Sequence, residues 1–187
     1  MKKHVHTAHA PFPTPLGDLL LAATPQGLSG AWFVDGQKGS PDGADWGPPT
    51  PGHPLLAEAA RQLSDYFAGR RTHFDLPLDL SRGTPFQQAV WRALLGIAGG
   101  QSQSYTQVAE RIGRPAAVRA VGTAVGANPL SIIVPCHRVL GRGGALTGYA
   151  GGLARKAALL RIEGWAVDAP VDGDAPGAAS RPRRAAP

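Results

Sequence analysis

The spacing of apolar residues changes at residues 81–83, and this change predicts a chain built from two unlike parts. Before this point, short apolar runs separated by Gly, Pro and Asp are typical of β-strands joined by turns. After it, apolar residues recur three and four positions apart, as on one face of a helix. A chain of 187 residues is long enough for two small domains. We therefore predict an α+β protein with an N-terminal domain at residues 1–82 and a mostly helical domain at residues 83–165.

The N-terminal part is predicted to be a small α/β domain around a short antiparallel sheet. Apolar residues 19–24 and 28–34 flank Pro25-Gln26-Gly27, which predicts a hairpin of buried strands. The remaining expected elements are, in order, a loop at residues 36–54, a helix at 54–68 that Gly69 ends, and a short strand at 74–80.

The C-terminal part is predicted to contain a helix-turn-helix. A first helix opens at Thr84-Pro85, where an N-cap residue precedes a proline at the first helical position. Ser104 and Gln107 fit a capping box at the start of a short helix that stops at Gly113. Pro115 starts another helix directly after the tight turn. Two short helices in this arrangement are typical of DNA-binding domains.

The second helix of the pair carries unusually small side chains beside a stripe of valines. Arg119 is its single long cation. One interpretation is a helix that approaches DNA closely and binds by shape and phosphate contact, since it has few side chains for reading bases. The other interpretation, equally supported by the residues, is a core helix packed tightly against its neighbours. The small residues in question include Ala117, Ala120, Gly122 and Thr123.

The positive charge of the chain lies in one segment. Residues 83–165 hold nine Lys/Arg and two acidic residues, a net charge of +7, whereas residues 1–82 hold seven and eight, a net of −1. A polyanion such as nucleic acid is the expected partner, although a merely basic domain gives the same count. No apolar run approaches the ~20 residues of a membrane span, so no membrane partner is expected. Because the first residues do not form a secretory signal, a cytoplasmic location is expected. Residues 166–187 are predicted to be a disordered tail.

Cys136 is the only cysteine, and its surroundings suggest a reactive thiol. It excludes intramolecular disulfides and zinc sites with several thiolates. An apolar run leads to Pro135-Cys136-His137-Arg138-Val139, where an imidazole and a guanidinium follow the thiol. A nearby base or positive charge favours the nucleophilic thiolate. A lone cysteine is nevertheless more often an inert buried residue.

The segment around Cys136 resembles the active-site signature of the methylated-DNA–protein-cysteine methyltransferases, or O6-alkylguanine-DNA alkyltransferases. The similarity covers nearly all of residues 83–165 in order and spacing, and more loosely the N-terminal strands. The resemblance implies a ribonuclease-H-like N-terminal domain packed on a winged-helix-like domain. Its matching motifs are Gly83-Thr84-Pro85-Phe86-Gln87, Arg119-Ala120-Val121-Gly122, Asn128-Pro129, Gly148-Tyr149-Ala150-Gly151-Gly152 and Glu163-Gly164.

By this resemblance the protein would take the alkyl group of O6-alkylguanine onto Cys136, once and irreversibly. His137, acting through a water, would accept the thiol proton, and Glu163 would orient His137. Asn128 would tie the helix-turn-helix to the cysteine loop. Tyr105 would help to rotate the nucleotide and to protonate the departing guanine.

The resemblance also implies how the substrate is held. Double-stranded DNA would lie with its minor groove on the small-residue helix, with little sequence preference, and Arg119 would fill the gap left by the flipped base. Tyr149, Ala150 and Gly151 would line the guanine pocket, and Val139 would offer a backbone carbonyl. Ala150 stands where some relatives have Ser, which leaves the range of alkyl groups open. Ser131 replaces a proline of many relatives, which is expected to loosen the turn before Cys136.

No cofactor and no metal are expected. The zinc site of some relatives needs cysteines that this chain lacks, and His4, His6 and His9 are expected to lie on a floppy end. The protein is expected to be a monomer, with cooperative loading on DNA and activity on O4-alkylthymine left open. Two alternatives remain: a non-catalytic alkyltransferase-like protein that binds lesions, which Cys136 argues against, and a cysteine hydrolase, which has no use for a helix-turn-helix.

Overall fold

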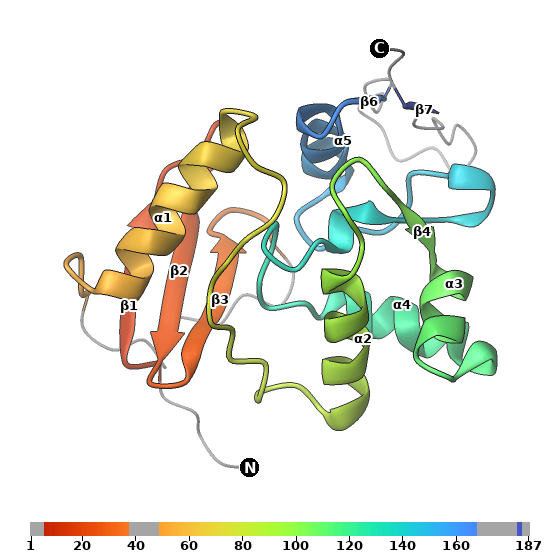
Figure 1. Ribbon diagram of the computed structural model, residues 1–187, viewed down its shortest axis with the longest axis horizontal. Helices are drawn as coiled ribbons and strands as arrows, with labels where there is room; N and C mark the ends of the chain where they lie inside the picture. Colours follow the sequence, from red (N-terminus) through yellow and green to blue (C-terminus); the bar gives the residue numbers. More distant parts are fainter. Residues whose placement is uncertain (1–5, 38–48, 168–182, 185–187) are drawn as a thin grey trace.

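The computed structural model describes residues 6–37, 49–167 and 183–184, and it shows two α+β domains packed side by side (Figure 1). The N-terminal domain is an antiparallel sheet of β1 (Ala8–Phe12), β2 (Leu19–Thr24) and β3 (Gly27–Phe33), in the order β1-β2-β3. Helix α1 (Pro54–Phe67) lies across the sheet and buries Leu56, Ala59, Leu63 and Tyr66. The predicted hairpin and helix are confirmed.

Two strand predictions differ from the structure. The strand expected at residues 74–80 is absent, and only an isolated bridge joins Leu28 to Leu78. Pro77 has no N–H to donate, so it contributes only its carbonyl, which accepts from Leu28 N at 2.8 Å. Strand β1 was not predicted, because it contains Pro11 and its residues do not form a clear apolar run. It pairs with β2 only, and an edge strand tolerates proline.

The C-terminal domain begins with α2 (Pro85–Leu95), which opens at Thr84 as predicted and ends at Gly96. The predicted N-cap at Thr84 and the predicted capping box at Ser104 are present, and the structure completes the former into a capping box with Gln87; Ser104 opens α3 (Tyr105–Arg111). A 3-10 turn, η2 (Pro115–Ala117), precedes α4 (Val118–Gly126), so the second helix of the helix-turn-helix starts three residues later than expected.

The rest of the C-terminal domain surrounds the cysteine. The 3-10 turn η3 (Cys136–Arg138) leads into β5 (Val139–Leu140), which runs parallel to β4 (Gln103–Ser104). A further 3-10 turn, η4 (Arg142–Gly144), precedes helix α5 (Leu153–Ile162), for which no prediction was made. Strand β6 (Trp165–Ala166) pairs with β7 (Arg183–Arg184), so the expected tail contains a paired segment; residues 168–182 and 185–187 of that tail lie outside the described residues.

One continuous apolar core joins the two domains, and the backbone before the cysteine is attached to the sheet. Ala31 N donates to Pro129 O, and Ser131 N donates to Ala31 O, both at 2.9 Å. The edge strand β3 therefore extends its pairing to the segment that delivers Cys136. No helix in the part of the chain that the structure describes is long and apolar enough to cross a membrane.

Candidate active site and DNA-binding face

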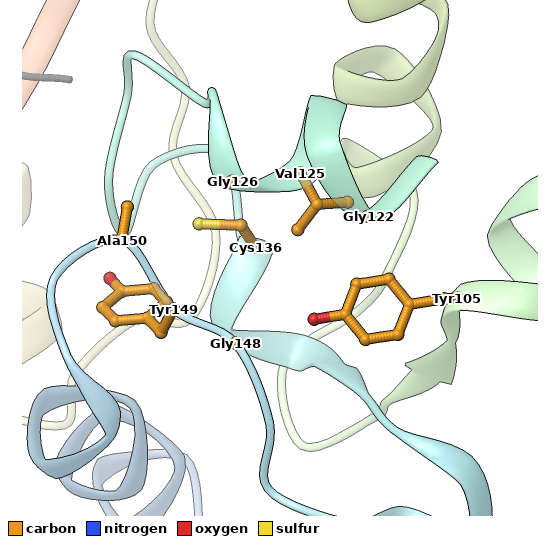
Figure 2. A pocket seen from close by; sticks show the side chains of 8 residues that line it. All are labelled: Tyr105, Gly122, Val125, Gly126, Cys136, Gly148, Tyr149 and Ala150. Atoms are coloured by element: carbon orange, nitrogen blue, oxygen red, sulfur yellow. The ribbon is translucent and has the colours of Figure 1, made fainter. Parts of the chain in front are cut away.

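Cys136 lies at the base of a pocket between α4 and the loop that precedes α5 (Figure 2). The residue is only 4% exposed. The cavity has a volume of about 280 Å³, which is in the size range of a nucleobase site. Figure 2 shows Tyr149 and Ala150 on one side of the thiol and Tyr105 on the other. The lining residues are Tyr105, Gly122, Val125, Gly126, Cys136, Gly148, Tyr149 and Ala150.

Asn128 joins the end of α4 to the cysteine loop. Its Nδ2 lies 3.1 Å from Cys136 Sγ and donates to Val134 O at 2.9 Å. Its Oδ1 accepts from Leu130 N at 3.0 Å. The side chain is buried, so these bonds replace those it would make with water. The structure thus places Asn128 where the resemblance expects a tie between the helix-turn-helix and the thiol.

The turn before Cys136 is held under constraint. Ile132 has φ of 72°, which is uncommon for a β-branched residue, and it is completely buried. The Ser131 hydroxyl lies 3.0 Å from Gln37 Oε1 in the N-terminal domain. Burial of Ile132 and the contacts of Ser131 hold this conformation in place. Ser131 therefore ties the turn to the other domain, and whether it loosens the turn relative to a proline stays a prediction.

Behind the thiol, His137 and Glu163 form a buried pair. His137 Nε2 lies 2.8 Å from Glu163 Oε1. Arg138 donates to both oxygens of the same carboxylate, from Nε at 2.9 Å and from Nη2 at 2.8 Å. Tyr66 of α1 also donates to Glu163 Oε1, at 2.9 Å. Three donors therefore converge on one carboxylate, and one of them comes from the N-terminal domain.

The charges of this network follow from its contacts. Burial raises the pKa of Glu163, but the hydrogen bonds from His137 and Arg138 and the charge of Arg138 outweigh it and bring the pKa to about 2. Burial lowers the pKa of His137 below its ordinary value, so the imidazole is neutral near pH 7. An ionised carboxylate only accepts hydrogen bonds, so Nε2 of His137 carries the proton. Its Nδ1 is buried, has no hydrogen-bond partner among the described residues, and is free to accept a proton.

The thiol itself is protonated in this state. Burial raises the pKa of Cys136, while the Asn128 hydrogen bond and the charge of Lys156 act in the opposite direction. The sequence analysis expected the neighbouring Arg138 to favour the thiolate. The structure instead directs Arg138 onto Glu163 and places Lys156 as the cation that acts on the thiol.

Lys156 and Tyr66 are site residues that the sequence analysis missed. Lys156 is fully buried on α5, and its Nζ donates to the carbonyls of Val139 and Thr147 at 2.6 Å. It lies on the same helix face as Leu159 and Leu160. A lysine spaced three and four residues from these leucines could have indicated a buried cation. Tyr66 also lies on a buried helix face, where nothing in the sequence distinguishes it from a core aromatic.

The predicted pocket residues divide into two groups. Tyr149 and Ala150 line the cavity, and the Ala150 N–H has no acceptor among the described residues. Val139 and Gly151 lie behind the lining and are buried, with Val139 O accepting from Lys156. The hydroxyl of Tyr105 lines the opposite wall and donates to Thr147 O at 3.3 Å.

The small residues of helix α4 lie mostly on its exposed side, so the interpretation of a core helix packed through them is wrong. Val121 and Val125 are buried in the core, while Arg119, Ala120 and Thr123 are exposed. Ala117 is half-buried at the start of the helix, and Gly122 faces the pocket. The outer face is therefore nearly smooth, carries a single long cation, and adjoins the mouth of the thiol pocket.

The histidines near the start of the chain are structural where they are described. His6 is buried, its Nδ1 lies 2.9 Å from Ser29 Oγ, and its Nε2 contacts the Arg82 guanidinium. His9 lies in β1. The expectation of a floppy end is wrong for these two, and His4 lies outside the described residues. Within residues 6–37, 49–167 and 183–184, no group of three or more His, Cys, Asp or Glu could hold a metal ion.

A helix-turn-helix with a smooth outer face, beside a buried thiol backed by a neutral histidine and a carboxylate, is characteristic of DNA-acting proteins with a reactive cysteine. Two family models match the chain. Residues 8–80 match the ribonuclease-like domain of 6-O-methylguanine DNA methyltransferase, and residues 85–165 match its DNA-binding domain. The chain belongs to the 6-O-methylguanine DNA methyltransferase family.

Individual relatives agree with this assignment. The methylated-DNA–protein-cysteine methyltransferase of Mycobacterium tuberculosis H37Rv is 50% identical over 150 residues, which cover 80% of this chain and 88% of the relative. That of Methanosarcina acetivorans is 45% identical over 156 residues, covering 83% and 97%. Among solved structures, Mycobacterium tuberculosis OGT in complex with DNA has a TM-score of 0.77 at 47% identity, covering 84% of this chain and 92% of that one.

Proposed function

We propose that this protein repairs DNA by direct reversal, transferring the alkyl group of O6-alkylguanine to Cys136 once per molecule. The observation that carries the proposal is the position of Cys136 Sγ. It lies at the base of a nucleobase-sized pocket that opens beside the smooth face of α4. The O6 substituent lies inside a duplex, so a buried thiol reaches it only when the nucleotide is rotated out of the stack.

The chemistry requires a thiolate that forms when the substrate is bound. His137 Nδ1 would take the thiol proton through a water, while its Nε2–H stays bonded to Glu163. The thiolate attacks the alkyl carbon, so a C–S bond forms as the C–O6 bond breaks. The electron pair goes to guanine, which takes up a proton with the help of the Tyr105 hydroxyl. The thioether product has no good leaving group, which explains a single event per molecule.

The pocket wall would recognise guanine by shape and by backbone groups. Tyr149 and Tyr105 would lie on either side of the base. The Ala150 N–H would donate to O6, where negative charge develops in the transition state. The Cys136 carbonyl would accept from the exocyclic amine. Val139, whose carbonyl accepts from Lys156 Nζ, and buried Gly151 would support the wall from behind.

The outer face of α4 would lie in the minor groove of double-stranded DNA. Ala117, Ala120, Gly122 and Thr123 let the backbone approach, and Arg119 is placed to enter the stack. Phosphate contacts from the +7 segment would supply most of the affinity, which would fall with salt and show little sequence preference.

The domain roles follow from these positions. The part at residues 1–82 would act as scaffold, and residues 83–165 would hold both DNA and thiol. We propose a monomer that acts in the cytoplasm, where bacteria and archaea, the sources of the relatives above, keep their DNA. O4-alkylthymine is a second candidate substrate, and cooperative loading on DNA is left to measurement.

The test is intact mass after incubation with a duplex that carries one O6-methylguanine. The expected result is a gain of one methyl group, mapped to Cys136, while the oligonucleotide reverts to guanine. Cys136→Ser and an undamaged duplex are the controls, and neither should show a mass gain. If the protein binds the lesion tightly while no mass changes, it is a non-catalytic lesion-binding protein and the proposal is wrong.

A further inference from the structure

Arg155, on the first turn of α5, contacts three separate segments of the protein. Its Nε donates to Leu16 O at 2.8 Å, and its Nη1 donates to Asp35 O at 2.9 Å. The same Nη1 lies 3.2 Å from Gly151 O. The guanidinium also covers the ring of Phe33, at 4.3 Å from the ring centroid. Leu16, Phe33 and Asp35 belong to the N-terminal domain, whereas Gly151 belongs to the loop that forms the pocket wall.

Most of this contact set is sheltered from water. The Arg155 side chain is 17% exposed, whereas its ion-pair partner Asp35 is 74% exposed. An exposed carboxylate contributes little by itself, because solvent screens the pair. The carbonyl acceptors and the aromatic face are therefore the main partners of the guanidinium.

Within its own domain the loop is held by Lys156, whose Nζ donates to Gly148 O at 3.1 Å, and by the bond from Gly152 N to Tyr149 O at 3.0 Å. Arg155 adds hydrogen bonds that join the loop to the N-terminal domain. Glycines with positive φ flank the loop, at 52° for Gly148 and 90° for Gly152, so its ends permit backbone conformations that other residues avoid. The Gly151 backbone packs closely against two aromatic rings. A Cβ at this position would lie 2.8 Å from Tyr149 Cε1 and 3.2 Å from Phe33 Cδ2. The loop therefore packs against the Phe33 ring, and the Arg155 guanidinium covers the same ring.

We propose that Arg155 is a positioning residue for alkyl transfer: it fixes the Tyr149–Gly151 wall of the reaction pocket against the N-terminal domain. The proposal rests on the proposed function. It gives the N-terminal domain a second role in the site, next to the Tyr66 contact with Glu163. A wall displaced by about 1 Å misaligns the guanine and slows an in-line displacement strongly. The helix-turn-helix lies on other elements, so binding to undamaged DNA does not depend on Arg155.

The experiment measures single-turnover methyl transfer over a range of O6-methylguanine duplex concentrations, for the wild type, Arg155→Ala and Arg155→Lys. Arg161→Ala is the matched control, because Arg161 lies on the same helix and its Nε bonds to Val167 O, away from the pocket. Asp35→Asn removes only the exposed carboxylate. Affinity for an undamaged duplex, the fraction of active protein and hydrogen–deuterium exchange of residues 148–152 are measured in parallel.

For Arg155→Ala, the rate constant at saturating duplex is expected to fall between about tenfold and about a hundredfold. Exchange of residues 148–152 should become faster, with unchanged affinity for undamaged DNA. The rate constant of Arg155→Lys should lie between those of Arg155→Ala and the wild type, because lysine keeps the charge but lacks the several planar N–H donors of the guanidinium. Asp35→Asn and Arg161→Ala should stay within about twofold of the wild type.

A purely structural role gives a different pattern. If Arg155→Ala and Arg155→Lys lose active fraction or thermal stability but the remaining active protein transfers methyl at the wild-type rate, the proposal is overturned. Slower exchange or no change at residues 148–152 overturns it as well. A wild-type protein that transfers no methyl group overturns the proposed function itself, and with it this role of Arg155.

Discussion

The hydroxyl of Tyr66 donates a 2.9 Å hydrogen bond to Glu163 Oε1, so helix α1 of the N-terminal domain contacts the carboxylate that His137 binds. Both side chains are buried, and 97 residues separate them in the sequence. The scaffold domain therefore does more than support the fold. Its helix supplies a hydrogen bond that helps to hold the Glu163 carboxylate in one position behind the thiol.

Replacing Tyr66 with Phe tests this contact, because it removes the hydroxyl and keeps the ring. Glu163 keeps its bonds to His137 and Arg138, so the loss should be partial. We expect a decrease of about 1.5–3 kcal/mol in the free energy of unfolding, as for a hydrogen bond to a charged group. Methyl transfer should also slow. Urea denaturation and single-turnover rates check this, and an unchanged rate would show that the contact serves stability only.

Replacing Glu163 with Gln should change how stability depends on pH. The folded pKa of Glu163 is about 2, below its ordinary value of 4.5, so the carboxylate stabilises the fold fully above about pH 4.5 and loses this effect as the pH falls toward 2. At neutral pH the variant leaves the buried Arg138 without its charged partner, although it keeps its bonds to Ile97 O and Thr72 O, and this should cost up to about 3–5 kcal/mol. The difference in the free energy of unfolding between the wild type and Glu163→Gln should become smaller as the pH falls. Glu110→Gln, at an exposed position, is the control. If the stability difference between Glu163→Gln and the wild type does not depend on pH, the lowered pKa of Glu163 is wrong.

The neutral state of His137 predicts a flat pH profile for the reaction. An exposed histidine gains its proton near pH 6.5, whereas burial lowers the pKa of His137 below this value. The thiol, whose pKa is raised, stays protonated over the same range. The single-turnover rate should therefore be constant around pH 7 and should fall on acidification only with a midpoint below pH 6.5. If the rate falls on acidification with a midpoint near pH 6.5, His137 has the pKa of an ordinary histidine. If the rate rises tenfold per pH unit, the Cys136 thiol loses its proton to solvent and not to His137.

How much of the fold could be predicted depended on whether the signals were local. The N-cap at Thr84, the capping box at Ser104 and the hairpin around Pro25-Gln26-Gly27 are encoded within a few residues, and the structure contains all of them. The apolar residues 74–80 failed as a strand because pairing depends on a distant partner, and Pro77 offers that partner only a carbonyl. Helix α5 was not predicted, and its charged residues face both the core and the solvent.

The candidate site shows the same division. Cys136 and His137 are adjacent, and their family motif made them and Glu163 identifiable before the structure was known. The contacts that complete the site join distant segments: Tyr66 with Glu163, and Arg155 with Leu16 across 139 residues. Sequence spacing carries no information on such pairs. The structure also reassigned Arg138, whose position after His137 indicated a role toward the thiol but whose guanidinium binds Glu163.

Replacing Asn128 with Ala should destabilise the protein, because several buried groups lose a partner together. The amide of Asn128 serves Val134 O, Leu130 N and Cys136 Sγ. We expect a loss of about 2–3 kcal/mol in the free energy of unfolding. The pKa of the Cys136 thiol should rise further, because the Asn128 hydrogen bond lowers it in the wild type. Urea denaturation and the pH dependence of iodoacetamide alkylation check both effects. Thr123→Ala, on the exposed face of the same helix, should change stability by less than about 0.5 kcal/mol.

Replacing Arg119 with Ala separates base extrusion from chemistry. Arg119 is exposed on α4 and is proposed to fill the gap that the flipped nucleotide leaves. A single strand has no stack to open, so extrusion matters only in a duplex. For a duplex with O6-methylguanine we expect methyl transfer to slow about tenfold, which corresponds to about 1.4 kcal/mol. For the same lesion in a single strand the rate should stay near that of the wild type. Arg61→Ala, an exposed arginine of α1, should leave both rates unchanged. Equal losses on both substrates would show that Arg119 contacts the backbone and does not enter the stack.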